Sequence, residues 1–92
     1  MEGKPDERVW QARDDLFYRK LVDGGMLYDG RYRRVHHLNA TAAFVWEACQ
    51  RGQETSEMVR DLCRSFDVDD ERARTDVEAI LERFVRAELL LP

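Results

Sequence analysis

Hydrophobic and polar positions alternate in part with a period of two in the first part of the chain. Residues 16–22, LFYRKLV, are rich in aromatic and aliphatic residues and alternate partly with this period, and shorter runs occupy residues 26–28 and 32–38. This period, with an enrichment in aromatic and aliphatic residues, predicts β-strands. The intervening Asp-Gly sequences at 23–25 and 29–30 tolerate positive φ angles and predict tight turns. We therefore expect a three-stranded antiparallel meander.

From Asn39 onward the hydrophobic positions recur every three or four residues, which is typical of helices. Asn39 is expected to cap a first helix, with Gly52 just beyond its end. Thr55 is expected to cap a second helix, and Asp69 or Asp70 a third. The residues predicted to form the three buried stripes are Ala42, Val45, Trp46, Cys49, Met58, Val59, Leu62, Phe66, Ala73, Val77, Ile80, Leu81 and Phe84.

Three strands followed by three helices predict an α+β domain with one shared core. Two short helices and a longer one, beside a β-hairpin, are typical of a winged helix-turn-helix. We expect this domain to occupy residues 15–92. Residues 1–14 are expected to form a flexible N-terminal segment, in which Val9 and Trp10 could add a short strand. The apolar residues 89–91 are expected to dock on the core.

Composition narrows the class of protein. The chain has 92 residues, 43% of them hydrophobic and 37% charged, which suits one small folded domain. Its formal net charge is -4, whereas a protein that binds nucleic acid through the phosphates is usually basic. No apolar run is long enough to span a membrane, and the N-terminus lacks the pattern of a signal peptide. We therefore expect a cytoplasmic protein that binds neither nucleic acid nor membrane.

Four side chains are the candidates for metal or catalytic chemistry: His36, His37, Cys49 and Cys63. Adjacent histidines on a strand point to opposite faces, and the two cysteines lie on different predicted helices, so a shared zinc site is not expected. Neither thiol has a base and an orienting group at a recognisable spacing. The sequence therefore predicts no metal site, no cofactor, no catalytic residue and no enzymatic activity.

The third strand is the first candidate binding feature. If it lies at the edge of the sheet, its free N–H and C=O groups can pair with an extended peptide. The residues that make this edge locally basic, and would favour an acidic peptide, are Arg31, Arg33, Arg34, His36 and His37. Alternatively, the charges only protect an exposed edge from aggregation, and the sequence leaves both interpretations open.

The third helix is the second candidate. In a winged helix that binds DNA, this helix enters the major groove. Its outer face here mixes acidic and basic residues, so it could equally be a helix that only covers the sheet. A DNA-binding regulator, and a structural subunit that pairs with another chain through the strand edge, are therefore alternatives to a peptide-binding protein.

An ordered set of short motifs resembles the PqqD-like family. Residues 38–46, LNATAAFVW, are similar to the family's L-N-x-T-A-x-x-[IV]-[WL] segment. Residues 62–68 are similar to L-x-x-x-[FY]-x-V, and residues 76–90 to the ending D-V-x-x-[FI]-L-x-x-[LF]-x-x-x-x-L-L. The resemblance covers residues 16–91, which is nearly the whole predicted domain.

Two positions depart from the family pattern. Glu88 stands where the family often has glycine, and Asp29 where it often has proline. This form looks more like the stand-alone proteins of lasso-peptide gene clusters than like PqqD of quinone-cofactor biosynthesis.

The resemblance implies a recognition element for ribosomally synthesised and post-translationally modified peptides (RiPPs). Such a domain binds the leader of a precursor peptide as a strand added to the third strand, in the groove toward the third helix. It presents the leader to a modifying enzyme, such as a leader peptidase or a radical SAM enzyme. The implied peptide-binding residues are Arg33, Arg34, Val35, His36, His37, Leu38, Arg74, Val77, Glu78, Leu81 and Phe84.

The resemblance therefore implies a non-catalytic adaptor whose partners are a precursor peptide and an enzyme. An unpaired strand edge can also self-associate, so we expect a monomer or a weak homodimer. Whether His36 or His37 faces the groove is left open by the sequence.

Overall fold

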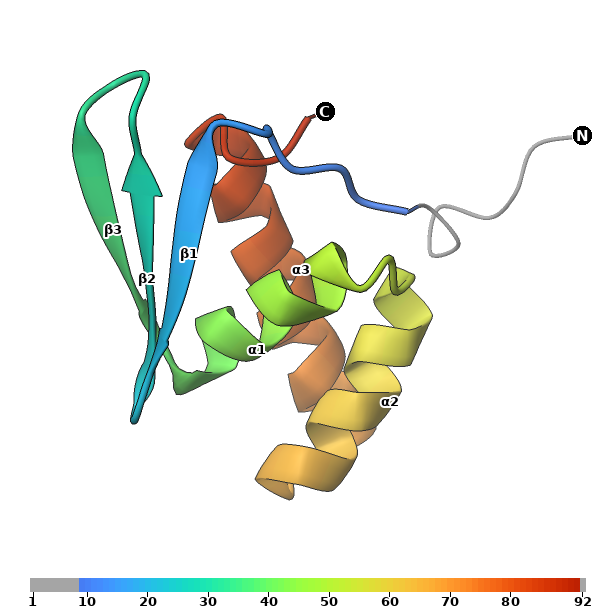
Figure 1. The fold of residues 1–92 in the computed structure, drawn as a ribbon. Coiled ribbons are helices and arrows are strands. Elements are labelled where there is room, and N and C mark those ends of the chain that lie inside the picture. The colour runs from blue at the N-terminus through green and yellow to red at the C-terminus, as the bar shows by residue number, and fades with distance from the viewer. Residues whose placement is uncertain (1–8, 92) are drawn as a thin grey trace, which may run out of the picture.

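The structure, a computed structural model, describes residues 9–91 and begins with a three-stranded sheet (Figure 1). Strands β1 (Leu16–Leu21), β2 (Gly24–Asp29) and β3 (Arg34–Asn39) pair antiparallel in the order β1-β2-β3. Each strand follows its neighbour in sequence, so the sheet is the predicted meander, with β1 and β3 at its two edges.

Three helices follow: α1 (Ala40–Gln50), α2 (Thr55–Phe66) and α3 (Asp70–Arg86). In the part of the chain that the structure describes, all three lie on one side of the sheet (Figure 1). The arrangement confirms the α+β class and the winged helix-turn-helix architecture, because a small antiparallel sheet and a helical bundle share one core.

The turn between β1 and β2 differs from the prediction. It consists of Val22 and Asp23, because Leu21 pairs with Gly24. Gly24 and Gly25 therefore belong to β2, and they allow close packing rather than forming the turn. A Cβ atom at Gly24 would collide with the backbone of β3, and one at Gly25 would lie 2.5 Å from a ring carbon of Tyr18.

The turn between β2 and β3 is longer than predicted, and β3 begins at Arg34 instead of residue 32. The Asp29 carboxylate accepts hydrogen bonds from the backbone N–H groups of Arg31 and Tyr32, at 3.0 and 3.2 Å. Arg33 then adopts a left-handed conformation with a φ of 54°. The side chain of Asp29 thus holds these residues in a turn, so the third strand begins later in the sequence than predicted.

The first helix begins as predicted. The Asn39 side chain accepts a hydrogen bond from the backbone N–H of Ala42 at 2.8 Å, so Asn39 is the N-cap of α1. Arg51 is the C-cap, and Gly52 follows it with a φ of 77°, where glycine is favoured.

The cap of the second helix is Glu54, not Thr55. The Glu57 carboxylate accepts a hydrogen bond from the Glu54 backbone N–H at 2.9 Å, as in a capping box. Thr55 is already helical and buried, and its hydroxyl oxygen accepts a bond from the Trp10 indole at 3.1 Å. The third helix is capped by Asp69, whose carboxylate accepts a bond from the Arg72 N–H at 2.7 Å.

The core lies between the sheet and the three helices. Trp46, only 1% exposed, lies in this core, and its ring meets the Phe84 ring edge-to-face with the centroids 5.4 Å apart. Leu27 of β2 reaches the same cluster from the sheet. The predicted helical stripes are confirmed as core, except that Phe66 is only partly buried and packs on Phe44.

The two ends of the described chain meet beside the sheet. Leu89 and Leu90 are buried, which confirms that the end docks on the core, whereas Leu91 is 44% exposed. The backbone N–H of Leu91 donates to the Gln11 carbonyl at 2.8 Å, and Arg13 N–H donates to the Leu89 carbonyl at 3.3 Å.

The N-terminal segment 1–14 was expected to be flexible, and its first eight residues lie outside the described chain. The remainder contacts the domain through isolated bridges from Val9 to Glu54 and from Ala12 to Leu90. These bridges are single pairs and do not form a fourth strand in the sheet.

Candidate functional site

The backbone of β3 is directed alternately toward β2 and away from it. The two-residue turn makes Leu21 and Gly24 a hydrogen-bonded pair, so the backbone groups of Gly24 point toward β1. Because an antiparallel strand alternates, the groups of Gly25, Leu27 and Asp29 point toward β3. These three residues pair with the β3 residues Leu38, His36 and Arg34, respectively.

The same alternation identifies the backbone groups at the open edge. The N–H and C=O of Val35 and His37 lie between the bonded positions, so they are directed away from β2. In the described chain no further strand joins β3 on that side. The edge therefore offers regularly spaced donors and acceptors to an added strand.

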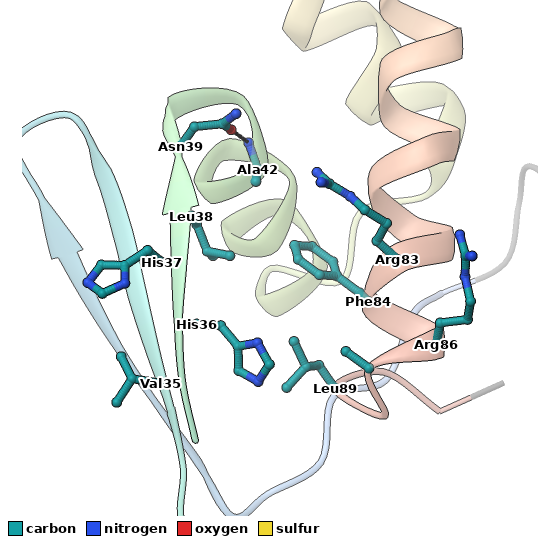
Figure 2. A pocket seen from close by; sticks show the side chains of 11 residues that line it. Val35, His36, His37, Leu38, Asn39, Ala42, Arg83, Phe84, Arg86 and Leu89 are labelled. Atoms are coloured by element: carbon teal, nitrogen blue, oxygen red, sulfur yellow. Dashed lines mark hydrogen bonds between the residues drawn. The ribbon is translucent and has the colours of Figure 1, made fainter. Parts of the chain in front are cut away.

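The side chains of β3 also alternate, and this shows which histidine faces the helices. His36 and Leu38 are half-buried and point toward the helical side, whereas Val35 and His37 are exposed and point to the other face (Figure 2). Val35 is 50% exposed, so it is not a core residue. Of the two histidines, His36 is the one on the groove side.

A groove of about 790 Å³ lies between β3 and the C-terminal end of α3 (Figure 2). Its lining combines apolar side chains from both elements with cationic and polar groups. The lining residues are Val35, His36, His37, Leu38, Asn39, Ala42, Arg83, Phe84, Arg86, Ala87 and Leu89.

Five of the residues expected to bind a peptide line this groove: His36, Leu38 and Phe84, with Val35 and His37 at its strand edge, where their side chains point to the opposite face. All but Phe84 come from β3, so the strand half of the expected site lies together at the groove. Phe84 forms the boundary between groove and core, because it is 5% exposed and its ring packs on Trp46.

Four expected residues on α3 lie away from the groove lining. Val77 and Leu81 are buried in the core, 0% and 2% exposed, so a peptide could reach them only by opening the domain. Arg74 and Glu78 form an i,i+4 ion pair at 3.7 Å. The reason is the direction of α3, since only its C-terminal end approaches the sheet (Figure 1).

The two arginines before Val35 also lie outside the groove lining. Arg33 is in the turn, with its left-handed backbone. The Arg34 guanidinium lies over the Tyr32 ring, 5.2 Å from its centroid, in a cation–π contact. Both are exposed at the entry to β3, where they add positive charge near the edge.

Sequence reasoning missed the last turn of α3. Arg83, Arg86 and Ala87 line the groove, and Leu89 follows from the segment after the helix. The signal was present, because Ile80, Phe84 and Ala87 continue one helical stripe at i, i+4, i+7 past the expected range. Arg83 and Arg86 both lie on one side of that stripe, at about 100° of rotation per residue.

The groove carries cationic side chains and a polar atom without an internal partner. Arg83 and Arg86 are exposed, and Arg86 lies 3.9 Å from Glu82, with both side chains about 70% exposed, so this pair is weak. Nε2 of His36 is shielded from solvent and has no hydrogen-bond partner among residues 9–91. A ligand in the groove could satisfy it.

The described residues give little support for metal binding, thiol catalysis or a membrane-spanning helix. No group of three or more His, Cys, Asp or Glu side chains there is arranged to hold a metal ion. Burial raises the pKa of the Cys49 thiol to about 12, so it is protonated at neutral pH and a poor nucleophile. Within residues 9–91, no helix is long and apolar enough to cross a membrane.

The fold and the groove define a class: a small winged helix-turn-helix domain with an open sheet edge beside a lined groove. Residues 24–90 match the family model described as coenzyme PQQ synthesis protein D (PqqD), and the chain belongs to this family. The match runs from the start of β2 to the buried residue Leu90, and so includes the edge strand and the groove. No curated protein matches the chain.

Two solved structures have a similar fold. A lasso peptide synthetase B1 complexed with the leader peptide superimposes with a TM-score of 0.84 and 22% identity, covering 92% of this chain and 100% of that one. TbiB1 in complex with the TbiA(beta) leader peptide gives a TM-score of 0.81 and 21% identity, covering 88% and 94%. The similarity extends over almost the entire length of both structures.

Proposed function

We propose that this chain is a non-catalytic adaptor that binds the leader of a ribosomally synthesised precursor peptide and presents it to a modifying enzyme. The observation that carries the proposal is the open edge of β3, where the backbone groups of Val35 and His37 point toward solvent beside the groove. An extended peptide that pairs with these groups becomes a fourth strand.

The geometry specifies how such a peptide would lie. Side chains of an added strand alternate, so one set enters the groove toward α3 and the other set extends the bare face of the sheet. The groove set meets the apolar surface of Leu38, Phe84 and Leu89. Main-chain hydrogen bonds give affinity for any extended segment, and contacts of its side chains with the groove give sequence specificity.

The charges of the groove favour an acidic leader. Arg83 and Arg86 project from the last turns of α3 and are exposed. A carboxylate among these groups gains charge-assisted hydrogen bonds, which are stronger than neutral ones. The leader therefore combines apolar anchors with at least one acidic side chain on its groove face.

The comparisons support this function in two ways. The chain belongs to the PqqD family, and two structures with the same fold are described as complexes with leader peptides. The partner that receives the bound leader is, in this proposal, an enzyme such as a leader peptidase or a radical SAM enzyme. The chain itself contributes binding and positioning.

The test is a fluorescence-polarisation titration of the chain against a labelled leader, taken from the short open reading frame beside its gene. Saturable binding at micromolar concentration or tighter is expected, on the order of -8 kcal/mol. A scrambled leader and a DNA duplex are the controls. Equal binding to the scrambled peptide, or tighter binding to DNA, would contradict the adaptor function.

A further inference from the structure

A second groove lies on the other side of the turn that follows α3. Its volume is about 690 Å³, close to the 790 Å³ of the first groove, the one between β3 and α3. Both volumes are in the range of ligand-binding sites, roughly 300–1,000 Å³. The second groove is bounded by the N-terminal segment, the β2–β3 turn and the end of the chain. Its apolar lining residues are Ala12, Val85, Leu90 and Leu91.

The second groove presents apolar surface beside charges that are already paired. Leu91 is 44% exposed, so part of this apolar surface can still be buried by a ligand. Arg31, which also lines the groove, lies 3.3 Å from the Asp15 carboxylate. Glu88 lines it too, and its carboxylate accepts a hydrogen bond from the Tyr32 hydroxyl at 2.7 Å. The chemistry therefore suits an apolar side chain better than a charged one.

The two grooves share the turn after α3. Glu88 lines the second groove, whereas its neighbours Ala87 and Leu89 line the first. The Glu88 backbone is left-handed, with a φ of 62°, so the chain changes direction at this residue. The Tyr32–Glu88 hydrogen bond joins this turn to the turn before β3, and it lies at the boundary between the two grooves.

The direction of an added strand determines which part of a leader reaches this boundary. The sheet is antiparallel throughout, and antiparallel pairs are slightly more stable than parallel ones. A leader that pairs antiparallel with β3 runs from the Asn39 end of the strand to the Arg34 end. Three positions beyond Arg34, the chain has reached Arg31 in the second groove. Leader residues that follow the strand-forming segment, the part paired with β3, therefore arrive beside this groove.

We propose that the second groove binds an apolar side chain of the precursor peptide, in the residues that directly follow the strand-forming segment. This inference rests on the proposed function. An extended chain advances about 3.3 Å per residue, so this side chain is expected about three to six residues after the segment. Backbone pairing at an edge permits several registers. A second apolar contact would fix both the register and the direction of the leader.

The experiment measures leader binding by fluorescence polarisation. A proline scan of the leader first identifies the strand-forming segment, as the residues at which proline weakens binding. Two labelled peptides are then compared: the segment alone, and the segment with the residues that follow it. Leu91→Ser and Val85→Thr each reduce the apolar surface of the second groove. Leu21→Ser is the matched control, because Leu21 is 41% exposed and lies outside the lining of both grooves.

The longer peptide is expected to bind the wild type about tenfold more tightly than the segment alone, as burial of one apolar side chain would produce. In Leu91→Ser and Val85→Thr this gain should fall to about threefold or less, while the segment alone binds as it does to the wild type. Unchanged binding of the segment also shows that each variant is folded. Leu21→Ser should keep the full gain. The loss is thus assigned by a double-mutant cycle between groove and peptide.

Two results would overturn the inference while the proposed function stands. An equal gain in the wild type, Leu91→Ser and Val85→Thr would show that the following residues bind elsewhere. A gain from residues that precede the segment, with none from those that follow it, would show that the leader runs in the opposite direction. If the wild type binds neither peptide, the proposed function falls as well, and the absence of segment binding distinguishes that outcome.

Discussion

The Arg13 guanidinium donates from both terminal nitrogens to the two carboxylate oxygens of Asp29, at 3.0 and 2.8 Å. Asp29 is 1% exposed and Arg13 9%. Arg13 also donates to the backbone carbonyl of Glu88 at 3.0 Å. One side chain thus connects the N-terminal segment, the end of β2 and the turn after α3, which is the turn that carries the groove residue Leu89.

Asp29→Asn should destabilise the domain. The substitution leaves the buried Arg13 cation without its bidentate partner and weakens the turn that Asp29 organises. We expect the melting temperature to fall by on the order of 10 °C. Asp76→Asn, which breaks the exposed pair with Arg72, is the control and should change it little. Equal effects of the two substitutions in thermal denaturation would contradict this account.

The same pair predicts how stability depends on pH. Hydrogen bonds from the Arg13 guanidinium hold the pKa of Asp29 well below its usual value. A carboxylate with a lowered folded-state pKa stabilises the fold above its unfolded pKa of about 4, and this contribution is lost as pH falls through the folded pKa. Denaturant titrations should therefore show wild type and Asp29→Asn converging in stability below about pH 4. A constant gap between them down to pH 2 would argue against it.

The pattern of hydrophobic, capping and turn residues along the sequence made most of the fold predictable. Local rules act within a few residues, so the alternation in β1, the Asn39 cap and the helical stripes could be read from the sequence. The Val22-Asp23 turn was missed because the steric need for glycine at Gly24 and Gly25 arises from contacts with β3 and Tyr18, which exist only once the strands have paired. The Arg13–Asp29 pair is likewise a tertiary contact that no local pattern indicates.

The same limit explains the site prediction. The strand side was predictable because the residues of β3 are consecutive in sequence, so they stay together at the edge wherever the strand lies. The helix side depends on where α3 crosses the sheet, which side-chain packing decides. The departures at Asp29 and Glu88 now have structural counterparts: Asp29 binds Arg13, and Glu88 adopts a φ of 62°, a conformation that glycine favours.

Asn39→Ala should lower the free energy of unfolding by about 1 kcal/mol. The Asn39 side chain accepts the bond from the Ala42 N–H at the junction between β3 and α1, and alanine cannot replace it. Asn39→Asp, which retains an acceptor oxygen, is the matched control and should keep most of the stability. Urea denaturation measures both, and no loss in the alanine variant would mean that the cap contributes nothing.

Arg83→Glu combined with Arg86→Glu should weaken leader binding by about tenfold. Both arginines line the groove and are exposed, so the domain should remain folded while the local charge is reversed. Arg60→Glu with Arg64→Glu makes the same change in net charge on α2, away from the groove, and should leave binding intact. Titrations at two salt concentrations should show a smaller salt dependence for the groove variant. Equal losses in the two double variants would indicate only a long-range effect of net charge.

Val35→Pro should weaken leader binding by about tenfold or more while the domain stays folded. The Val35 N–H points to the open edge, so proline removes a donor to the added strand but none of the bonds between β2 and β3. Val35→Ala shortens the same side chain and keeps the N–H, so it should bind almost like the wild type. Fluorescence polarisation reports affinity, and circular dichroism confirms that the helices are intact. A folded proline variant with wild-type affinity would exclude strand addition at this edge and move the peptide to side-chain contacts in the groove alone.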